Sequence, residues 1–183
     1  EKEHWDINYF TYIWLHMRKL LLVAGVLIFL ASCKQDPPRV LVFSKTKGYR
    51  HQSIKAGKEA LLKLGNEKGF AVDTTEAADV FTEDNLKKYR TVIFLSTTGD
   101  VLNQAQQNEF MRFIQAGGGY VGIHAAADTE YEWYWYGKLV GAYFKSHPQI
   151  QQARFKKVQN FGTGINLPDD WMRTDELYNY KNI

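Results

Sequence analysis

The chain has 183 residues, of which 45% are hydrophobic and 23% are charged, a balance that suits one globular domain with a core of its own. Its formal net charge of +3 is small and its basic residues are scattered, so we expect no nucleic-acid partner. Aromatic residues are abundant, with 5 Trp, 11 Tyr and 11 Phe, which suits a sugar-binding protein but also many ordinary domains.

The first apolar segment has the order of a secretory signal. Positive charge at residues 17–19 precedes the apolar residues 20–31, a run too short to span a bilayer comfortably. The sequence LASC at residues 30–33 closes the run and resembles a bacterial lipobox, in which the cysteine becomes lipidated. We therefore predict a lipoprotein signal peptide at 17–33 and a lipid anchor at Cys33, which would tether the chain to a membrane of the cell envelope, facing the periplasm or the cell surface.

Two short segments flank this signal. Residues 1–16 precede Met17, and we expect them to be mistranslated upstream sequence or a disordered segment; if they are genuine, the apolar run would instead be an internal membrane anchor. Residues 34–38 contain two prolines and form a linker.

From residue 39 onward, short apolar strands alternate with helical segments. Strands are predicted at 39–43, 70–74, 91–95, 120–123 and 152–158. Helices are predicted at 52–68, 82–86, 103–116 and within 131–144, the first with its apolar side formed by Ile54, Leu61, Leu62 and Leu64. This alternation predicts an α/β fold, a doubly wound parallel sheet with strand order 2-1-3-4 and helices on both faces.

The stretch around His124 organises the functional prediction. Glycines precede the predicted buried strand at 120–123, which ends at His124, and three alanines and Asp128 follow. Small residues allow a sharp strand-to-helix turn, and the side chain just past the strand is where open α/β sheets place their chemistry. We predict that His124 is functional; the alternative is a core histidine bonded to a neighbouring strand.

Polar residues follow two other strands that should end beside His124. They are Tyr49, Arg50 and His51 after the first strand, and Thr97, Thr98 and Asp100 after the third. With Asp128, these groups could perform acid–base chemistry or hold a divalent metal ion, although no compact metal-binding spacing fixes a cofactor. Simpler alternatives are that His51 or Asp100 caps a helix and that Arg50 is a surface charge.

Further residues are expected near this edge. The run WYWY at 133–136 has more rings than one buried face needs, so we expect Trp133, Trp135 and Tyr136 to flank a sugar; a hydrophobic flap over the sheet is the alternative. His147 precedes a proline, and it is either another histidine of the site or a residue that only serves the turn.

Several chemistries are excluded. The chain has no GxSxG elbow, no P-loop and no GxGxxG after the first strand, and its single cysteine lies in the predicted signal. A phosphate held on the amides of residues 97–100 is the weakest alternative, because that loop does not follow the first strand.

Six short motifs recur together in one known family. They are GYRH (48–51), GGYVGIHAAAD (118–128), YGKLVGAYF (136–144), HP (147–148), LPDDW (167–171) and DELYNY (175–180). Over residues 39–183 the chain thereby resembles the ThuA-like (trehalose utilisation) family. The sequence departs from the family at 160–166, where a His-Pro pair is usual, and it stops at 183, where the family domain usually continues, so we expect a C-terminally truncated domain.

The resemblance implies a flavodoxin-like fold similar to the class I glutamine amidotransferases. His124 stands where those enzymes carry their cysteine, so a glutaminase is not expected. The family implies a role in metabolism of trehalose-type disaccharides and their 3-keto derivatives. The polar residues that match it are His51, His124, His147, Asp175, Glu176 and Tyr178.

Two functions remain open from the sequence. The first is acid–base chemistry, metal-assisted or not, on a disaccharide or 3-keto-sugar, with His124, His51, Asp175 and Glu176 as catalytic residues. The second is a non-catalytic sugar-binding module of a larger secreted lipoprotein. In either case the substrate would be bound by the aromatic run and by six further residues: Tyr49, Arg50, Asp100, Asp128, His147 and Tyr178. The sequence predicts no oligomeric state.

Overall fold

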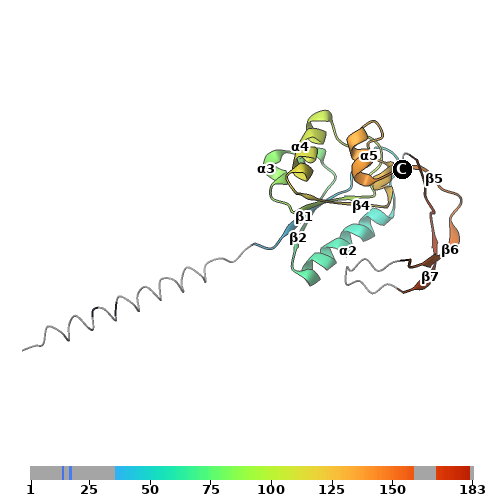
Figure 1. Ribbon diagram of the computed structural model, residues 1–183, viewed down its shortest axis with the longest axis horizontal. Coiled ribbons are helices and arrows are strands. Elements are labelled where there is room, and N and C mark those ends of the chain that lie inside the picture. Colours follow the sequence, from blue (N-terminus) through green and yellow to red (C-terminus); the bar gives the residue numbers. More distant parts are fainter. Residues whose placement is uncertain (1–13, 15–16, 18–35, 159–167, 182–183) are drawn as a thin grey trace, which may run out of the picture. The chain divides into compact units, whose positions relative to one another are not determined.

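A parallel four-stranded sheet lies at the centre of the fold (Figure 1). Its strands are β1 (Arg39–Phe43), β2 (Ala71–Thr75), β3 (Thr91–Leu95) and β4 (Gly119–Ile123). They run in the order β2-β1-β3-β4, and every neighbouring pair is parallel. The predicted fold class and strand order are confirmed.

The computed structural model describes residues 36–158 and 168–181, together with Trp14 and Met17. The helices are α2 (Ser53–Lys68), α3 (Glu83–Leu86), α4 (Gln104–Gln115) and α5 (Tyr134–Val140), and the 3-10 turns are η1 (Ala78–Val80) and η2 (His124–Asp128). Two antiparallel pairs follow: β5 (Tyr143–Ser146) with β8 (Asn179–Lys181), and β6 (Gln151–Lys156) with β7 (Asp170–Asp175).

Two predicted features lie outside the described residues. They are the signal at 17–33, apart from Met17, and the segment at 160–166 where the family motif departs. Within the part of the chain that the structure describes, no helix has the length and apolarity needed to cross a membrane.

Alternating residues of β1 and β3 supply two hydrophobic clusters, one on each face of the sheet. Phe43 and Phe94 pack on one face with residues of α3, α4 and α5, including the fully buried Phe110. Val42 and Leu95 form the other cluster with Leu61 of α2. Figure 1 shows the same arrangement, with α2 on the opposite side of the sheet from α3 and α4. Both faces are therefore covered, as a buried parallel sheet requires.

Local sequence explains where the helices begin and end. Asn103 and Gln106 form a capping box at the start of α4, and the Thr82 hydroxyl accepts a hydrogen bond from the Asn85 amide at the start of α3. Gly69 ends α2 in the left-handed conformation, with φ of 76°, where glycine has no steric penalty.

The inward face of α2 differs from the predicted one. Ile54 is buried and Leu61 half-buried, but Leu62 and Leu64 are exposed, so their inward assignment is wrong. Gly57 and Gly65 share the inner face with Ile54 instead: an added Cβ on Gly57 would meet Leu95, and one on Gly65 would meet Phe70 and Val72. The two glycines let the helix backbone approach the sheet closely.

The strand β4 is less buried than the sequence suggested. Val121 is exposed, and no residue of the strand is fully buried. The reason is its position, because among the described strands β4 pairs only with β3. Its carboxyl end nevertheless leads directly into the candidate site.

Candidate functional site

His124 is held at the carboxyl end of β4 by an uncommon backbone conformation. It is the first residue of η2 and has φ of 52°, in the left-handed region that few residues other than glycine adopt. The following alanines, 125–127, are buried, so the turn packs tightly under the histidine. Non-glycine residues held in this region cluster at functional sites; in this chain Ser96 and Glu130 also adopt it.

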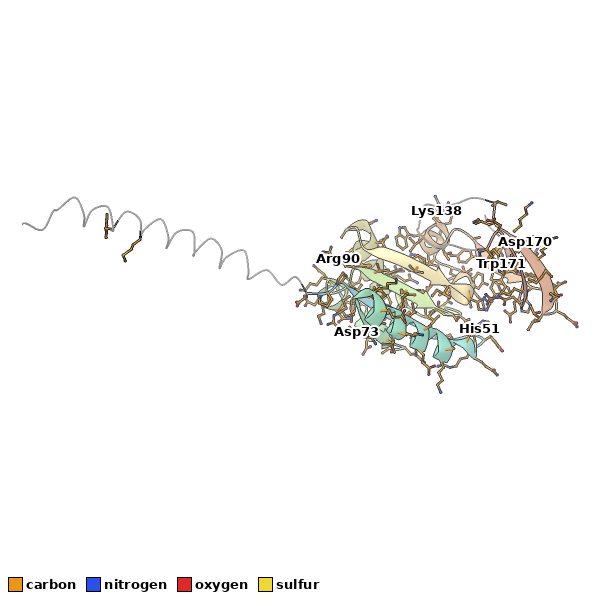
Figure 2. The ribbon with its side chains drawn as sticks, turned by 90° about the horizontal axis from the view of Figure 1, so that it is seen from below. His51, Asp73, Arg90, Lys138, Asp170 and Trp171 are labelled. Carbon is orange, nitrogen blue, oxygen red and sulfur yellow. The ribbon has the colours of Figure 1, made fainter. Side chains whose placement is uncertain are left out.

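Three other side chains converge on one nitrogen of His124. The Nε2 atom lies 3.3 Å from Nδ1 of His51, 3.1 Å from the hydroxyl of Tyr178 and 3.3 Å from Oε2 of Glu176. His51 comes from the loop between β1 and α2, whereas Glu176 and Tyr178 lie between β7 and β8. In Figure 2, His51 lies at the opposite end of the sheet from Arg90, which immediately precedes β3, as expected for a site at the carboxyl ends of the strands.

The surroundings fix the protonation of two of these groups. Burial lowers the pKa of His51, and the neighbouring His124 lowers it further, against the opposing effect of the Glu176 and Asp128 carboxylates. Burial, with the nearby Glu176 and Asp128 carboxylates, raises the pKa of Tyr178. At neutral pH, His51 is therefore predominantly neutral and Tyr178 keeps its proton.

A cleft of about 280 Å³ opens beside this cluster. Its lining comes from the loop after β1, the start of α2, the start of η2, the residue before β6, and the end of β7 with the residue after it: Tyr49, His51, Gln52, Ser53, His124, Ile150, Thr174, Asp175 and Glu176. Such a space accommodates a group the size of a sugar ring. The polar cluster forms part of its wall.

Packing of rings orients Tyr178 in the site. Its ring centroid lies 4.4 Å from that of Phe144 and 4.7 Å from that of His124. His147 stacks nearly parallel to Tyr178 at 5.9 Å, but it is exposed and its Nδ1 lies 2.7 Å from the Pro148 carbonyl oxygen. His147 is thus adjacent to the cluster without joining it.

Asp175 supports Glu176 rather than facing His124. Its Oδ1 atom accepts a hydrogen bond from the Glu176 amide, and its Oδ2 atom pairs with Arg173 at 2.7 Å. The residue also lines the cleft. Asp175 therefore holds the Glu176 backbone at the edge of the cleft, and its catalytic role stays a prediction.

The residues predicted to bind substrate after the first strand separate into two groups. Tyr49 is 66% exposed, lines the cleft and packs edge-on to His51 at 4.8 Å. Arg50 is exposed and makes a bidentate pair with Glu76, at 2.8 and 2.9 Å. His51 does not cap α2, because the helix begins after Gln52 and its first turn has no side-chain cap.

The two aspartates predicted to bind substrate do not line the cleft. Asp100 is exposed in the loop before α4, which Asn103 caps instead. Asp128 is half-buried and accepts a hydrogen bond from the Tyr131 hydroxyl at 2.5 Å. Its carboxylate still acts on the site electrostatically, through the pKa of His51 and Tyr178.

The aromatic run belongs mainly to the core, as in the alternative of a hydrophobic flap. Tyr136 is completely buried and its hydroxyl donates to the Ala126 carbonyl at 2.8 Å, so the prediction that it flanks a sugar is wrong. Trp133 and Trp135 stack on each other at 5.1 Å and pack against Phe110. Tyr134 is 74% exposed, but none of these rings lines the cleft. Tyr136, whose hydroxyl is hydrogen-bonded, and the two stacked indole rings therefore pack over the sheet as part of the core.

The hydroxyl groups of Thr97 and Thr98 and the Gly99 amide, in the loop after β3, already have hydrogen-bond partners within the protein. Thr98 accepts from the Gly48 amide and donates to the Tyr49 carbonyl, while Thr97 bonds Thr129 at 2.8 Å. The Gly99 amide donates to the backbone carbonyl oxygen of Asp128 at 2.8 Å. The loop instead ties the His51 segment to the turn after His124.

Glu130 is a structural residue that the sequence analysis missed. It is buried, and its Oε1 accepts hydrogen bonds from the amides of Val101 and Leu102 at 2.8 and 2.7 Å, while Oε2 accepts from Gln107 at 2.6 Å. A charged residue within an aromatic stretch is normally predicted to lie at the surface. No pattern in the sequence therefore indicates that Glu130 is buried. The bonds fix the loop after β3 against the turn that follows His124.

Three of the converging residues have the chemistry of metal ligands. Nitrogens of His51 and His124 and a carboxylate oxygen of Glu176 lie within 4.8 Å of one another. Imidazole and carboxylate are the ligands of catalytic zinc sites. The sequence predicted that His51 and His124 lie at the same edge of the sheet, whereas Glu176 was named only through the family motif.

Known proteins match this chain at two levels. Residues 39–183 match the family model described as ThuA, trehalose utilisation. A solved structure of a ThuA-like protein from Bacteroides uniformis shares the fold, with a TM-score of 0.65 and 24% sequence identity over 81% of this chain and 64% of that protein. The chain therefore spans just under two thirds of that protein's length, and the likeness to it shows the fold alone. No curated protein is significantly similar in sequence.

Proposed function

This chain belongs to the ThuA (trehalose utilisation) family, and we propose that it acts on a disaccharide or a 3-keto derivative of one by acid–base chemistry centred on His124. The family supports a role related to carbohydrate. One observation carries the finer proposal: His51, Glu176 and Tyr178 all converge on Nε2 of His124, beside a cleft large enough for a sugar ring.

Each converging residue has a role that its environment suits. His51, whose pKa is lowered, and the adjacent His124 form an imidazole pair that can accept a proton from a substrate hydroxyl or from a carbon next to a keto group. The Glu176 carboxylate, 3.3 Å from His124, stabilises the imidazolium that results. Tyr178, which keeps its proton, donates a hydrogen bond to the substrate oxygen on which negative charge develops.

The alternative is a sugar-binding module without catalysis. The exposed ring of Tyr49 beside the cleft favours sugar contact in either case, because aromatic rings stack on sugar faces. The chain would be incubated with a panel of disaccharides and their 3-keto derivatives, and products would be identified by mass spectrometry. Product formation supports the enzyme, while sugar binding by calorimetry without any product would leave the binding module.

We also propose that the chain is a lipid-anchored protein of the cell envelope. The support is the sequence at 17–33, where a charged start, an apolar run and LASC lead to Cys33. Wild-type chain expressed in a bacterial host should label with radioactive palmitate and sediment with membranes. Cys33→Ser should remove the label, and a labelled Cys33→Ser chain would contradict this localisation.

A further inference from the structure

We propose that His51, His124 and Glu176 bind a divalent transition-metal ion, with zinc as the preferred ion. The proposal deepens the function proposed above and rests on the same cleft, but it concerns metal binding and not turnover. The ligand atoms would be Nδ1 of His51, Nε2 of His124 and Oε2 of Glu176.

Two of the three distances between the ligand atoms match those of a tetrahedral zinc site. Zinc bonds nitrogen and oxygen at about 2.0–2.1 Å, so two ligand atoms at the tetrahedral angle lie about 3.3–3.4 Å apart. His124 Nε2 lies 3.3 Å from His51 Nδ1 and 3.3 Å from Glu176 Oε2. All three atoms lie within 4.8 Å of one another, and a side-chain rotation of His51 or Glu176 would bring the remaining pair to the same spacing.

Hydrogen bonding alone does not satisfy this arrangement. A ring nitrogen has either one proton or one lone pair, yet a nitrogen, a hydroxyl and a carboxylate oxygen all lie within 3.3 Å of Nε2 of His124. Only one of them can form a full hydrogen bond with it at a time. A metal ion placed between the three ligand atoms would accept a lone pair from each of them at the same time.

The Glu176 carboxylate gives an independent reason. Its Oε2 atom is shielded from solvent and makes no hydrogen bond within the described part of the chain. Although Oε2 lies 3.3 Å from His124 Nε2, a buried carboxylate oxygen without a hydrogen bond is costly, since its desolvation is not compensated. Coordination to a cation removes that cost, and the amide bond to Asp175 holds the residue in place for it.

Two imidazoles and one carboxylate form the ligand set of catalytic zinc sites in which a fourth position stays open. In this cleft, water or a sugar oxygen could occupy that position. A bound cation polarises a carbonyl group and lowers the pKa of bound water. The Tyr178 hydroxyl, 3.1 Å from His124 Nε2, lies within reach of a group bound there.

The test uses the full chain in detergent, stripped of metal by a chelator and studied without sugar. Zn²⁺ binding is measured by calorimetry, and Co²⁺ binding by its visible absorption, which reports tetrahedral geometry. The variants are His51→Ala, His124→Ala and Glu176→Gln, with His147→Ala as the matched control, since His147 stacks on Tyr178 but lies outside the ligand set. Circular dichroism checks that each variant is folded.

We expect one Zn²⁺ per chain and intense tetrahedral Co²⁺ bands in the wild type. Each ligand substitution should weaken binding by roughly 100-fold or more, since even an outer-shell partner is typically worth 10- to 100-fold, and His147→Ala should bind as the wild type. Absence of stoichiometric binding by the folded wild type, or affinity unchanged in folded Glu176→Gln, would overturn the metal site. Neither result would decide whether the chain turns over sugars by acid–base chemistry, because that proposal is tested by the separate turnover assay.

Discussion

At the scale of single residues, the backbone of His124 matters as much as its ring. Its left-handed φ of 52° directs the chain sharply from β4 into η2, and the three alanines that follow are buried. The residue type and the small neighbours could be read from the sequence. The φ angle and the contacts to His51 and Glu176 could not, because they depend on loops distant in the chain.

The Tyr178 hydroxyl should contribute to turnover and little to stability. Tyr178→Phe keeps the ring packed on Phe144 but removes the hydroxyl beside His124. We expect kcat to fall by about 100-fold, the lower range for a positioned proton donor, while the free energy of unfolding changes by less than about 1 kcal/mol. Tyr180→Phe, at an exposed position, is the matched control. Equal kcat in Tyr178→Phe and wild type would exclude this role.

In contrast to the Tyr178 hydroxyl, the Glu130 side chain should contribute mainly to stability. Glu130→Ala leaves the buried amides of Val101 and Leu102 without an acceptor, and we expect a loss of about 3 kcal/mol in urea unfolding. Glu130→Gln keeps an acceptor, and because burial raises the pKa of Glu130, the neutral side chain also avoids a buried charge. It should cost about 1 kcal/mol. Similar losses in the two variants would show that these hydrogen bonds are not what stabilises the loop.

At the scale of elements, hydrophobic pattern predicted the strands well and the helix faces less well. The runs that became β1 and β3 are apolar, short and bounded by polar residues, so their type was readable. The inner face of α2 was not readable from the hydrophobic pattern, because two of its residues are glycines, which let the helix approach the sheet closely but add no hydrophobic side chain. The aromatic run at 133–136 likewise gave no indication which of its rings face the core.

Gly65 of α2 provides a test of this close approach. Alanine is favoured over glycine in a helix by about 1 kcal/mol, but a Cβ at Gly65 would lie 2.7 Å from the Phe70 carbonyl oxygen and 2.7 Å from Val72. Steric strain should outweigh propensity, so we expect Gly65→Ala to destabilise the chain by about 1–3 kcal/mol. The control Asn66→Ala, at an exposed position of the same helix, should be neutral or stabilising. A stabilised Gly65→Ala in thermal unfolding would refute the close packing.

Glu76 joins the His51 loop to α2 and makes stability depend on pH. Hydrogen bonds from Arg50 and Lys58 lower its pKa from the ordinary 4.5 to about 2. Because the folded-state pKa is depressed, the stabilisation is present above about pH 4.5 and is lost as the pH falls toward 2. The Glu76 side chain is 41% exposed, so solvent screening limits the effect to about 1 kcal/mol.

The check is urea unfolding at pH 6 and pH 2.5 for wild type, Glu76→Gln and the control Glu59→Gln, an exposed residue of α2. Glu76→Gln should be less stable than wild type at pH 6, and the difference should shrink at pH 2.5. A difference that is the same at both pH values would mean that Glu76 does not stabilise through its charge.

At the scale of the whole molecule, the site depends on topology. The order β2-β1-β3-β4 brings the ends of β1 and β4 to one edge of the sheet, and the segment after β7 adds Glu176 and Tyr178. The strand-end rule predicted the first part from sequence. The second part entered only through the family motif, because no periodicity or spacing predicts how an antiparallel pair far along the chain returns to that edge.

The central claim is that His124 performs chemistry on a sugar. The most direct measurement compares wild type, His124→Ala and His147→Ala for turnover of the sugar panel and for sugar affinity. We expect His124→Ala to lose roughly 1,000-fold in kcat, within the range for a positioned acid or base, with sugar affinity changed only a few-fold and His147→Ala near wild type. Turnover that persists in folded His124→Ala, or no turnover of any sugar by a wild type that still binds them, would contradict the account.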